Sequence, residues 1–272
     1  MMFWRLARNI GYMNPLSPSW FLLLAAHIAL GCAIYMWLRN KPQEYKRKAM
    51  TGLAIGLWAL STTFTLERAA NPNYYFPITQ NLPLHFCSMV TFMLVPAFWL
   101  KGTSRWLQAY RALLFYPGAA AAFLAVIAPA EEYMNHPLLS MNTLFYFVHL
   151  GNVLLCSMLV VLGFHTPTVR GALGSLVTFF ILAMTVFPIT LAIRHWVDPA
   201  ANYYFSFDPA GSPIFEILYR LIPVPLLYQV PLLVLVIPVL LLQFGIYQLI
   251  NRIAQRRRHN PPSIRGSLQP QH

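Results

Sequence analysis

Seven apolar segments, each close to the length of a membrane-spanning helix, restrict what this sequence can fold into. They cover residues 19–38, 49–66, 82–100, 109–128, 141–164, 171–193 and 226–250. A helix needs about 20 apolar residues to cross the hydrocarbon core of a bilayer. Only 10% of the 272 residues are charged, whereas roughly a quarter are charged in soluble domains. The sequence therefore predicts an all-α, polytopic membrane bundle of about seven transmembrane helices over residues 1–250. We expect the basic tail, 251–272, to be disordered.

The Lys and Arg residues are distributed unevenly over the two sides of this bundle. Fourteen of the nineteen fall in the loops after the first, third and fifth spans and in the C-terminal tail. Cytoplasmic loops of multi-pass proteins carry such an excess of positive charge. We therefore expect the N-terminus outside, the C-terminus in the cytoplasm and a location in the plasma membrane. Clusters of this kind attract anionic lipid, here at the basic tail. No nucleic-acid-binding motif accompanies them, so we expect no nucleic-acid partner.

Polar side chains lie near the outer ends of two spans. With Pro83 in the first helical turn, where its missing N–H is not needed, His85 and Cys87 lie about one turn below the outer face. His149 lies in the outer half of the fifth span, and Asn152 follows three residues later on the same face. Ionisable groups at such depths are costly, and they commonly face a cavity, each other or a substrate.

Further polar residues are expected on the same side of the bundle. His27 falls at a similar depth in the first span, and Glu67 ends the second span on the outer side. Asn202 and Tyr203 lie in the long connector 196–225, which we interpret as a re-entrant or interfacial loop. Together these residues predict a polar pocket that opens towards the outer leaflet. The inner half of the bundle has no comparable set.

Cys87 is the candidate nucleophile of this pocket. A thiol reacts as its thiolate, which a helix N-terminus and a nearby imidazole both favour. His149 is the candidate base, because His85 is only two residues from Cys87 and such side chains do not face each other on a helix. His85 is then left to orient substrate or to stabilise an oxyanion. The alternatives are a small buried thiol at Cys87 and, at His149, a structural histidine bonded to a carbonyl of a neighbouring helix or to Asn152.

The same side chains raise the question of a metal. His27, His85, Cys87 and His149 are all of a type that binds zinc. No CxxC or HExxH pattern accompanies them. We therefore expect neither a metal nor a cofactor. All three cysteines of the chain lie in apolar segments, which also argues against a disulfide framework.

The run LPLHFC at residues 82–87 resembles a motif of the transmembrane protein 164 family, which includes YwaF-like bacterial membrane proteins. Further matches follow in order: FYPG at 115–118, FYFVHLG at 145–151, and Asn202-Tyr203 with Pro209 downstream. The resemblance implies an acyltransferase that remodels ether phospholipids, with Cys87 as the nucleophile and His149 as the histidine. The fold is also similar to that of the androgen-induced-gene hydrolases, which use a threonine and a histidine on lipid esters.

Two functions follow from these observations. The first is a cysteine-dependent phospholipid acyltransferase, or a related lipid ester hydrolase, whose acyl donor and lysolipid acceptor are membrane lipids. The second is a non-catalytic protein that binds or transports a lipid or another small molecule in the same polar pocket. A thiol-reactive lipid probe separates them, because an enzyme should be labelled at Cys87 in preference to Cys32 and Cys156.

Overall fold

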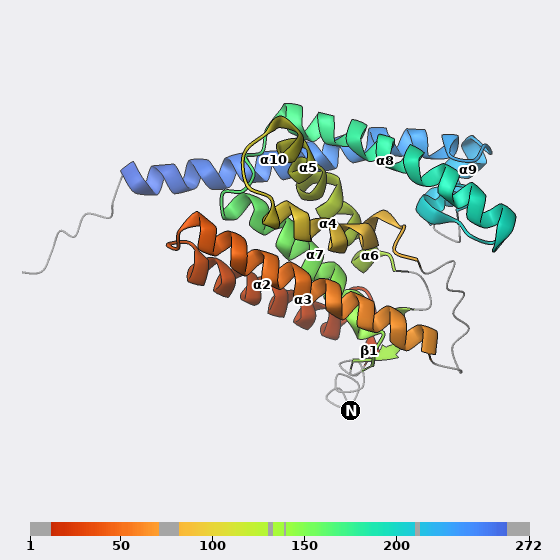
Figure 1. Cartoon of the computed structure of the whole chain (residues 1–272), viewed down its shortest axis with the longest axis horizontal. Coiled ribbons are helices and arrows are strands. Elements are labelled where there is room, and N and C mark those ends of the chain that lie inside the picture. Colours follow the sequence, from red (N-terminus) through yellow and green to blue (C-terminus); the bar gives the residue numbers. More distant parts are fainter. Residues whose placement is uncertain (1–11, 71–81, 130–132, 139, 210–212, 260–272) are drawn as a thin grey trace, which may run out of the picture.

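The computed structural model describes residues 12–70, 82–129, 133–138, 140–209 and 213–259, which form a bundle of helices (Figure 1). The α-helices are α2 (Pro18–Leu38), α3 (Gln43–Ala70), α4 (Phe86–Trp99), α5 (Arg105–Leu113), α6 (Ala119–Ile127), α7 (Thr143–Val161), α8 (Val169–Trp196), α9 (Pro213–Leu221) and α10 (Val230–His259). One π-helical turn, η1 (Leu114–Gly118), joins α5 to α6, and two 3-10 turns, η3 (Tyr203–Phe205) and η4 (Leu227–Gln229), flank α9. Two short strands, β1 (Tyr12–Met13) and β2 (His136–Pro137), pair antiparallel.

The predicted spans are confirmed as helices. In the described part of the chain, six segments are long and apolar enough to cross a membrane, and α4 is a shorter apolar helix. The six are Pro18–Leu38, Gln43–Ala70, Arg105–Ile127, Thr143–Val161, Val169–Trp196 and Leu227–Ile253. The protein is therefore a multi-pass integral membrane protein. Helix α10 continues to His259, so the first residues of the predicted disordered tail are helical. The rest of the tail lies outside the described residues.

Helix α7 lies in the middle of the bundle, where it contacts α2, α3, α4 and α6 (Figure 1). Glycine allows two of these contacts to be close. A Cβ on Gly151 of α7 would lie 2.8 Å from Leu57 of α3, and a Cβ on Gly31 of α2 would lie 2.5 Å from Leu154 of α7. Small residues at helix contacts are the usual means of close packing in membranes. Helix α10, in contrast, leaves most of its side chains exposed, as expected for a surface that faces lipid.

Helix α4 begins at Phe86, four residues later than the sequence predicts. Residues 82–84 form a tight turn, and His85 is the extended N-cap of the helix with φ −69° and ψ 137°. Helical backbone is disfavoured at Leu82 because proline follows it. Pro83 therefore stands in a turn before the helix, and its predicted place in the first helical turn is wrong. As a result, Cys87 is the second residue of α4.

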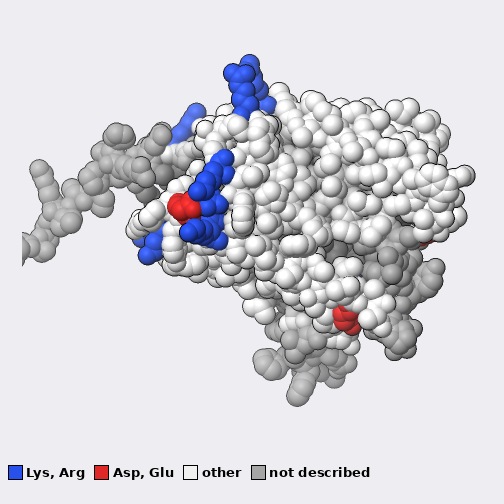
Figure 2. Space-filling view, in the orientation of Figure 1, with Lys and Arg blue, Asp and Glu red and all other residues white. Residues whose placement is uncertain are grey.

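The basic loops gather at one end of the bundle. The turn between α2 and α3 and the C-terminal end of α10 both lie at the left of Figure 1. The Lys and Arg side chains visible in Figure 2 lie towards the same end. The ammonium of Lys101, from the turn between α4 and α5, lies 3.6 Å from the carboxylate of Glu44 near the start of α3. The two basic turns are therefore neighbours, as expected if both lie on one side of the membrane.

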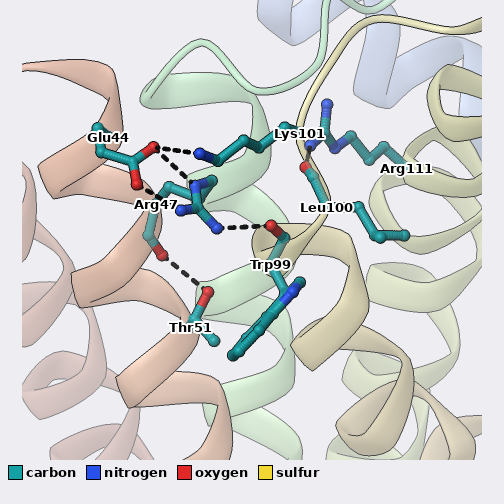
Figure 3. A network of polar contacts seen from close by, with 7 residues as sticks. All are labelled: Glu44, Arg47, Thr51, Trp99, Leu100, Lys101 and Arg111. Atoms are coloured by element: carbon teal, nitrogen blue, oxygen red, sulfur yellow. Dashed lines mark hydrogen bonds and ion pairs between the residues drawn. The ribbon is translucent and has the colours of Figure 1, made fainter.

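Two arginines hold the C-terminal end of α4 (Figure 3). Arg111 of α5 is only 3% exposed, and its guanidinium donates hydrogen bonds of 2.9–3.2 Å to backbone carbonyls. The acceptors are Ala97, Leu100, Gly102 and Phe164. Arg47 of α3 donates to the carbonyl of Trp99 at 2.7 Å and also pairs with Glu44. Cations at a helix C-terminus satisfy its last carbonyls and oppose its dipole.

Arg111 belongs to a polar cluster that the sequence does not predict. His165, which is 5% exposed, bonds through Nδ1 to the Gln108 side chain at 2.9 Å, and Gln108 also donates to the carbonyl of Phe164 at 3.4 Å. The expectation that the inner half of the bundle has no polar set is therefore wrong. Arg111 looks like an ordinary loop cation in the sequence, but it is buried because it satisfies the carbonyls that end α4.

Candidate functional site

The candidate site lies where α4 begins beside the middle of α7. Asn152 is fully buried, and its Nδ2 donates to the carbonyl of Cys87 at 3.2 Å and to Oγ1 of Thr91 at 2.9 Å. Thr91 follows Cys87 by four residues, so the two side chains share a face of α4. The thiol of Cys87 therefore lies on the side of α4 that meets α7, and it is half-buried.

Helices α4 and α7 run in the same direction. At their C-terminal ends, Arg111 joins the carbonyl of Ala97 in α4 to that of Phe164 just after α7. At their other ends, His149 precedes Asn152 by three residues and shares its face. His149 therefore lies on the face of α7 that carries the Asn152 contact, one turn closer to the N-terminal end of that helix.

His149 is held in one tautomer. The residue is 5% exposed, and its Nδ1 lies 2.7 Å from the carbonyl of Phe145. A carbonyl can only accept a hydrogen bond, so the neutral ring carries its proton on Nδ1 and its lone pair on Nε2. Within the described residues, Nε2 has no hydrogen-bond partner. His149 thus presents a free basic nitrogen inside the bundle, without a direct hydrogen bond to the thiol. Catalytic hydrogen bonds are often long before substrate binds.

His85 faces a different group of residues. Its ring lies edge-on to Tyr203, with 5.6 Å between ring centroids, and 5.4 Å from the ring of Phe205. Both aromatic residues belong to η3, in the connector between α8 and α10. His85 therefore contacts this connector, while Cys87 lies on the face that meets α7. The two side chains diverge at the start of α4.

Asn202 is the N-cap of the turn η3, and Tyr203 is its first residue. The Asn202 amide donates to the backbone and the carboxylate of Asp208 at 2.9 Å, and it accepts from the N–H of Phe207 at 2.9 Å. Asn202 therefore closes the loop on itself. Tyr203 is fully buried beside His85, and its hydroxyl has no hydrogen-bond partner in the described residues. An unpaired buried hydroxyl is costly and suggests a missing acceptor.

His27 and Glu67 lie apart from these residues. The His27 Nδ1 is 2.9 Å from the carbonyl of Leu23, and its ring is 4.7 Å from that of Phe147. Phe147 and His149 are two residues apart and so point to different sides of α7. His27 therefore meets another side of α7 than the one beside Cys87. Glu67 is partly exposed on α3, and no hydrogen bond between described residues joins it to Cys87 or His149.

The described residues contain no group of three or more His, Cys, Asp or Glu side chains that could hold a metal ion. The three cysteines are free: Cys32 is exposed, Cys87 is half-buried and Cys156 is buried.

Two residues of the site are absent from the sequence predictions. Thr91 anchors Asn152, and its spacing of four residues from Cys87 is a usable signal once α4 is recognised. Tyr204 packs its ring against Phe86, with centroids 6.2 Å apart. No sequence pattern predicts this contact, because it depends on how a connector more than a hundred residues away folds back onto α4.

These features define a multi-pass helical membrane protein in which a buried Asn of α7 bonds to the first turn of α4 at Cys87 and Thr91. The model of the TMEM164 family matches residues 15–247, which is well over half of the chain. The chain therefore belongs to the TMEM164 family, which confirms the resemblance seen in its motifs. No curated protein and no solved structure gives a significant match to the chain.

Proposed function

We propose that this protein is a membrane-embedded acyltransferase that moves acyl chains between phospholipids, with Cys87 as nucleophile and His149 as base. One observation supports the proposal: Asn152, which shares a face of α7 with His149, donates a hydrogen bond to the Cys87 carbonyl, and Nε2 of His149 has no partner among the described residues. A nucleophile and an oriented base on facing elements are the minimum that covalent acyl transfer requires.

The reaction proceeds in two half-reactions. Nε2 of His149 takes the proton of the Cys87 thiol, and the thiolate attacks the ester carbonyl carbon of a phospholipid. The bond from that carbon to the ester oxygen breaks, and the departing lysophospholipid oxygen receives the proton from His149. The acyl chain remains on Cys87 as a thioester. The hydroxyl of a second lysolipid then attacks the thioester, and its proton returns through His149 to the Cys87 sulfur.

The surroundings of the site favour transfer over hydrolysis. His149 and Asn152 are both buried inside a bundle whose helices are apolar enough to span a membrane. Lipid substrates reach such a site from the bilayer, whereas water is scarce there.

His85, Asn202 and Tyr203 are assigned to substrate orientation at the loop over α4. The same proposal includes a plasma-membrane location, a site that opens towards the outer leaflet, and anionic lipid at the basic tail.

The test uses purified protein in lipid nanodiscs with a phosphatidylcholine that carries a labelled acyl chain and an ether lysophospholipid acceptor. Mass spectrometry of the lipids measures exchange, and the intact mass of the protein reveals a thioester that hydroxylamine cleaves. Cys87→Ser should abolish both signals, while Cys32→Ala and Cys156→Ala should behave like the wild type. Full exchange by Cys87→Ser would rule out covalent catalysis at this thiol.

A second function, non-catalytic binding or transport of a lipid, is favoured by one observation. The Nε2 of His149 makes no hydrogen bond to the thiol. A binding site does not require such a bond, whereas a catalytic site requires it once substrate is bound. A lipid probe with a thiol-reactive carbonyl separates the two functions. In an enzyme, the probe acylates Cys87 much faster than the exposed Cys32. In a binding protein, the rate at which each cysteine reacts with the probe follows its exposure alone.

A further inference from the structure

Helix α9 lies between the ends of two helices that are long enough to span a membrane. Helix α8 ends at Trp196 and α10 begins at Val230, and Figure 1 places α9 at the end of the bundle opposite the basic turn between α2 and α3. Its nine residues extend over about 13 Å, whereas the hydrocarbon core is about 30 Å thick. Helix α9 is therefore too short to cross. The exposed Trp196 is of a type that is enriched at membrane interfaces.

One face of α9 is apolar and exposed. Ile217 and Leu221 are both exposed, and because they are four residues apart they lie on the same face. The charged residues Glu216 and Arg220 flank this face. Exposed apolar side chains continue along the chain from α9 into α10, at Val224, Leu227, Val230 and Val234. A short amphipathic helix that continues a lipid-facing surface is typical of the boundary between headgroups and acyl chains.

The opposite face of α9 packs against the loop 203–208. The ring of Phe215 lies 4.8 Å from that of Phe205, and the ring of Tyr219 lies 5.2 Å from that of Tyr228, both measured between centroids. The hydroxyl of Tyr228 in turn donates to the carbonyls of Phe205 and Asp208. Helix α9 and the turn η4 therefore support this loop together.

The backbone of the loop depends on that support. Tyr204 has φ 57°, Phe205 has φ 54° and Leu226 has φ 64°, a conformation that residues other than glycine rarely adopt. Gln229 donates its Nε2 to the carbonyls of Tyr204 and Phe205 at 2.6 and 2.8 Å. The N–H of Leu226 donates to the carbonyl of Ser206 at 2.7 Å. Such left-handed residues persist only where the surroundings impose them.

The same loop rests on the start of α4. The rings of Tyr203 and Phe205 contact that of His85, and the ring of Tyr204 packs against Phe86. A continuous series of contacts thus runs from α9 through the loop to the first residues of α4.

We propose that α9 docks into the lipid surface at this end of the bundle and thereby holds the loop 203–208 against the start of α4. Its partner is the boundary between phospholipid headgroups and acyl chains. Ile217 and Leu221 enter the acyl region, while the opposite face of α9 keeps the loop in its left-handed conformation. When α9 leaves the lipid, the loop relaxes. This assignment holds whether or not Cys87 is catalytic.

Depth-dependent fluorescence quenching tests where α9 lies. A bimane label is attached at Ile217→Cys, or at Ile181→Cys as the matched control, in protein that also carries Cys32→Ala, Cys87→Ser and Cys156→Ala. Ile217 and Ile181 are 62% and 60% exposed, and Ile181 lies midway along α8. The nanodiscs contain phosphatidylcholine brominated either close to the headgroup or deep in the acyl chains.

The two labels should respond in opposite ways. The label at Ile217→Cys should be quenched more strongly by the shallow bromines, and the label at Ile181→Cys by the deep ones. If the label at Ile217→Cys is quenched most by the deep bromines, or by iodide in the water and by neither lipid, α9 does not lie in the interface and the proposal fails.

Hydrogen exchange tests whether α9 holds the loop. Ile217→Asp puts a charge on the exposed face of α9, and Ile217→Val, the control, keeps that face apolar. In nanodiscs, the amide of Leu226, which bonds to Ser206, should exchange at least about tenfold faster in Ile217→Asp, because burial of one isoleucine side chain shifts an equilibrium by that much. The amides of α7 should keep their protection, and Ile217→Val should exchange like the wild type.

Two results of the exchange measurement overturn the proposal. Unchanged exchange at Leu226 in Ile217→Asp means that α9 does not hold the loop. Equal acceleration in Ile217→Asp and Ile217→Val means that the side chain acts inside the protein and not through the lipid.

Discussion

The side-chain amide of Asn152, midway along α7, donates a 3.2 Å hydrogen bond to the backbone carbonyl of Cys87 in the first turn of α4. The same amide donates a second hydrogen bond to Thr91, which lies one turn after Cys87 in α4. These bonds fix the height of α4 against α7. His149 shares the Asn152 face of α7, so these bonds support the proposed pairing of His149 with Cys87.

Replacing Asn152 should therefore separate the reacting groups. Asn152→Leu keeps the volume but loses both hydrogen bonds, each worth about 0.5–1.5 kcal/mol. We expect a lower melting temperature in detergent and at least a tenfold slower acylation of Cys87. Ser157→Ala, which removes a bond within α7 alone, is the control. Unchanged acylation in Asn152→Leu would show that the two helices keep their register without this amide.

The fold is largely predictable from the sequence, because each apolar segment must form a helix on its own in lipid, where backbone groups have no water to bond. All seven predicted spans are helices for this reason. The start of α4 is less predictable. Pro83 is acceptable either in the first turn of a helix or in a turn that precedes it. Only the contacts of His85 with the loop at 203–205 decide between these two conformations.

The site is predictable only where its residues share a helix. His149 and Asn152 lie on one face of α7 because of their spacing, which the sequence contains. The register between α7 and α4 depends on Asn152 and Thr91, which are 61 residues apart, so spacing gives no information about it. The burial of Arg111 is not predictable for a similar reason: its acceptors are backbone carbonyls, which no sequence pattern identifies.

Arg111 should be essential to the stability of the bundle. Arg111→Met would leave four carbonyls without this donor, two of them in buried hydrogen bonds and two in part-buried ones, and each unpaired buried group costs about 1–3 kcal/mol. We expect poor expression or a melting temperature lower by more than 10 °C. Arg105→Met, at an exposed position of the same helix, should melt like the wild type. A stable Arg111→Met variant would mean that water satisfies these carbonyls equally well.

His165 should make the protein sensitive to acid. Burial, and secondly the charge of Arg111, lower the pKa of His165 from 6.5 to about 4. His165 is therefore protonated below pH 6.5 in the unfolded chain but only below about pH 4 in the folded protein. Stability should fall as the pH falls through this window. His165→Gln removes the titrating group, so the melting temperature should decline less steeply from pH 7 to pH 4. If the melting temperatures of the wild type and of His165→Gln decline equally, His165 is not the cause of the acid sensitivity.

The charge distribution predicts the orientation of the bundle. Lys101 and Glu44 lie together at the basic end of the molecule, which the positive-inside rule assigns to the cytoplasm. A protease site inserted beside Lys101, or a tag on the C-terminal tail, should be protected when protease is added to intact cells. A tag at the N-terminus should be cleaved. Cleavage beside Lys101 together with a protected N-terminus would show that the orientation is the opposite one. The Cys87 site would then face the other leaflet.

The two histidines near Cys87 should respond differently to pH. If His149 removes the thiol proton, His149→Ala should slow thioester formation about 10²- to 10⁴-fold. Raising the pH should partly restore the rate, because hydroxide then ionises the thiol directly. His85 contacts the loop rings and not the α7 face, so we expect no rescue of His85→Ala by pH. If His85 donates a hydrogen bond to the substrate, His85→Gln should retain more activity than His85→Ala. The pH–rate profiles of the three variants decide the assignment. If high pH rescues His85→Ala and leaves His149→Ala inactive, the roles of the two histidines are reversed.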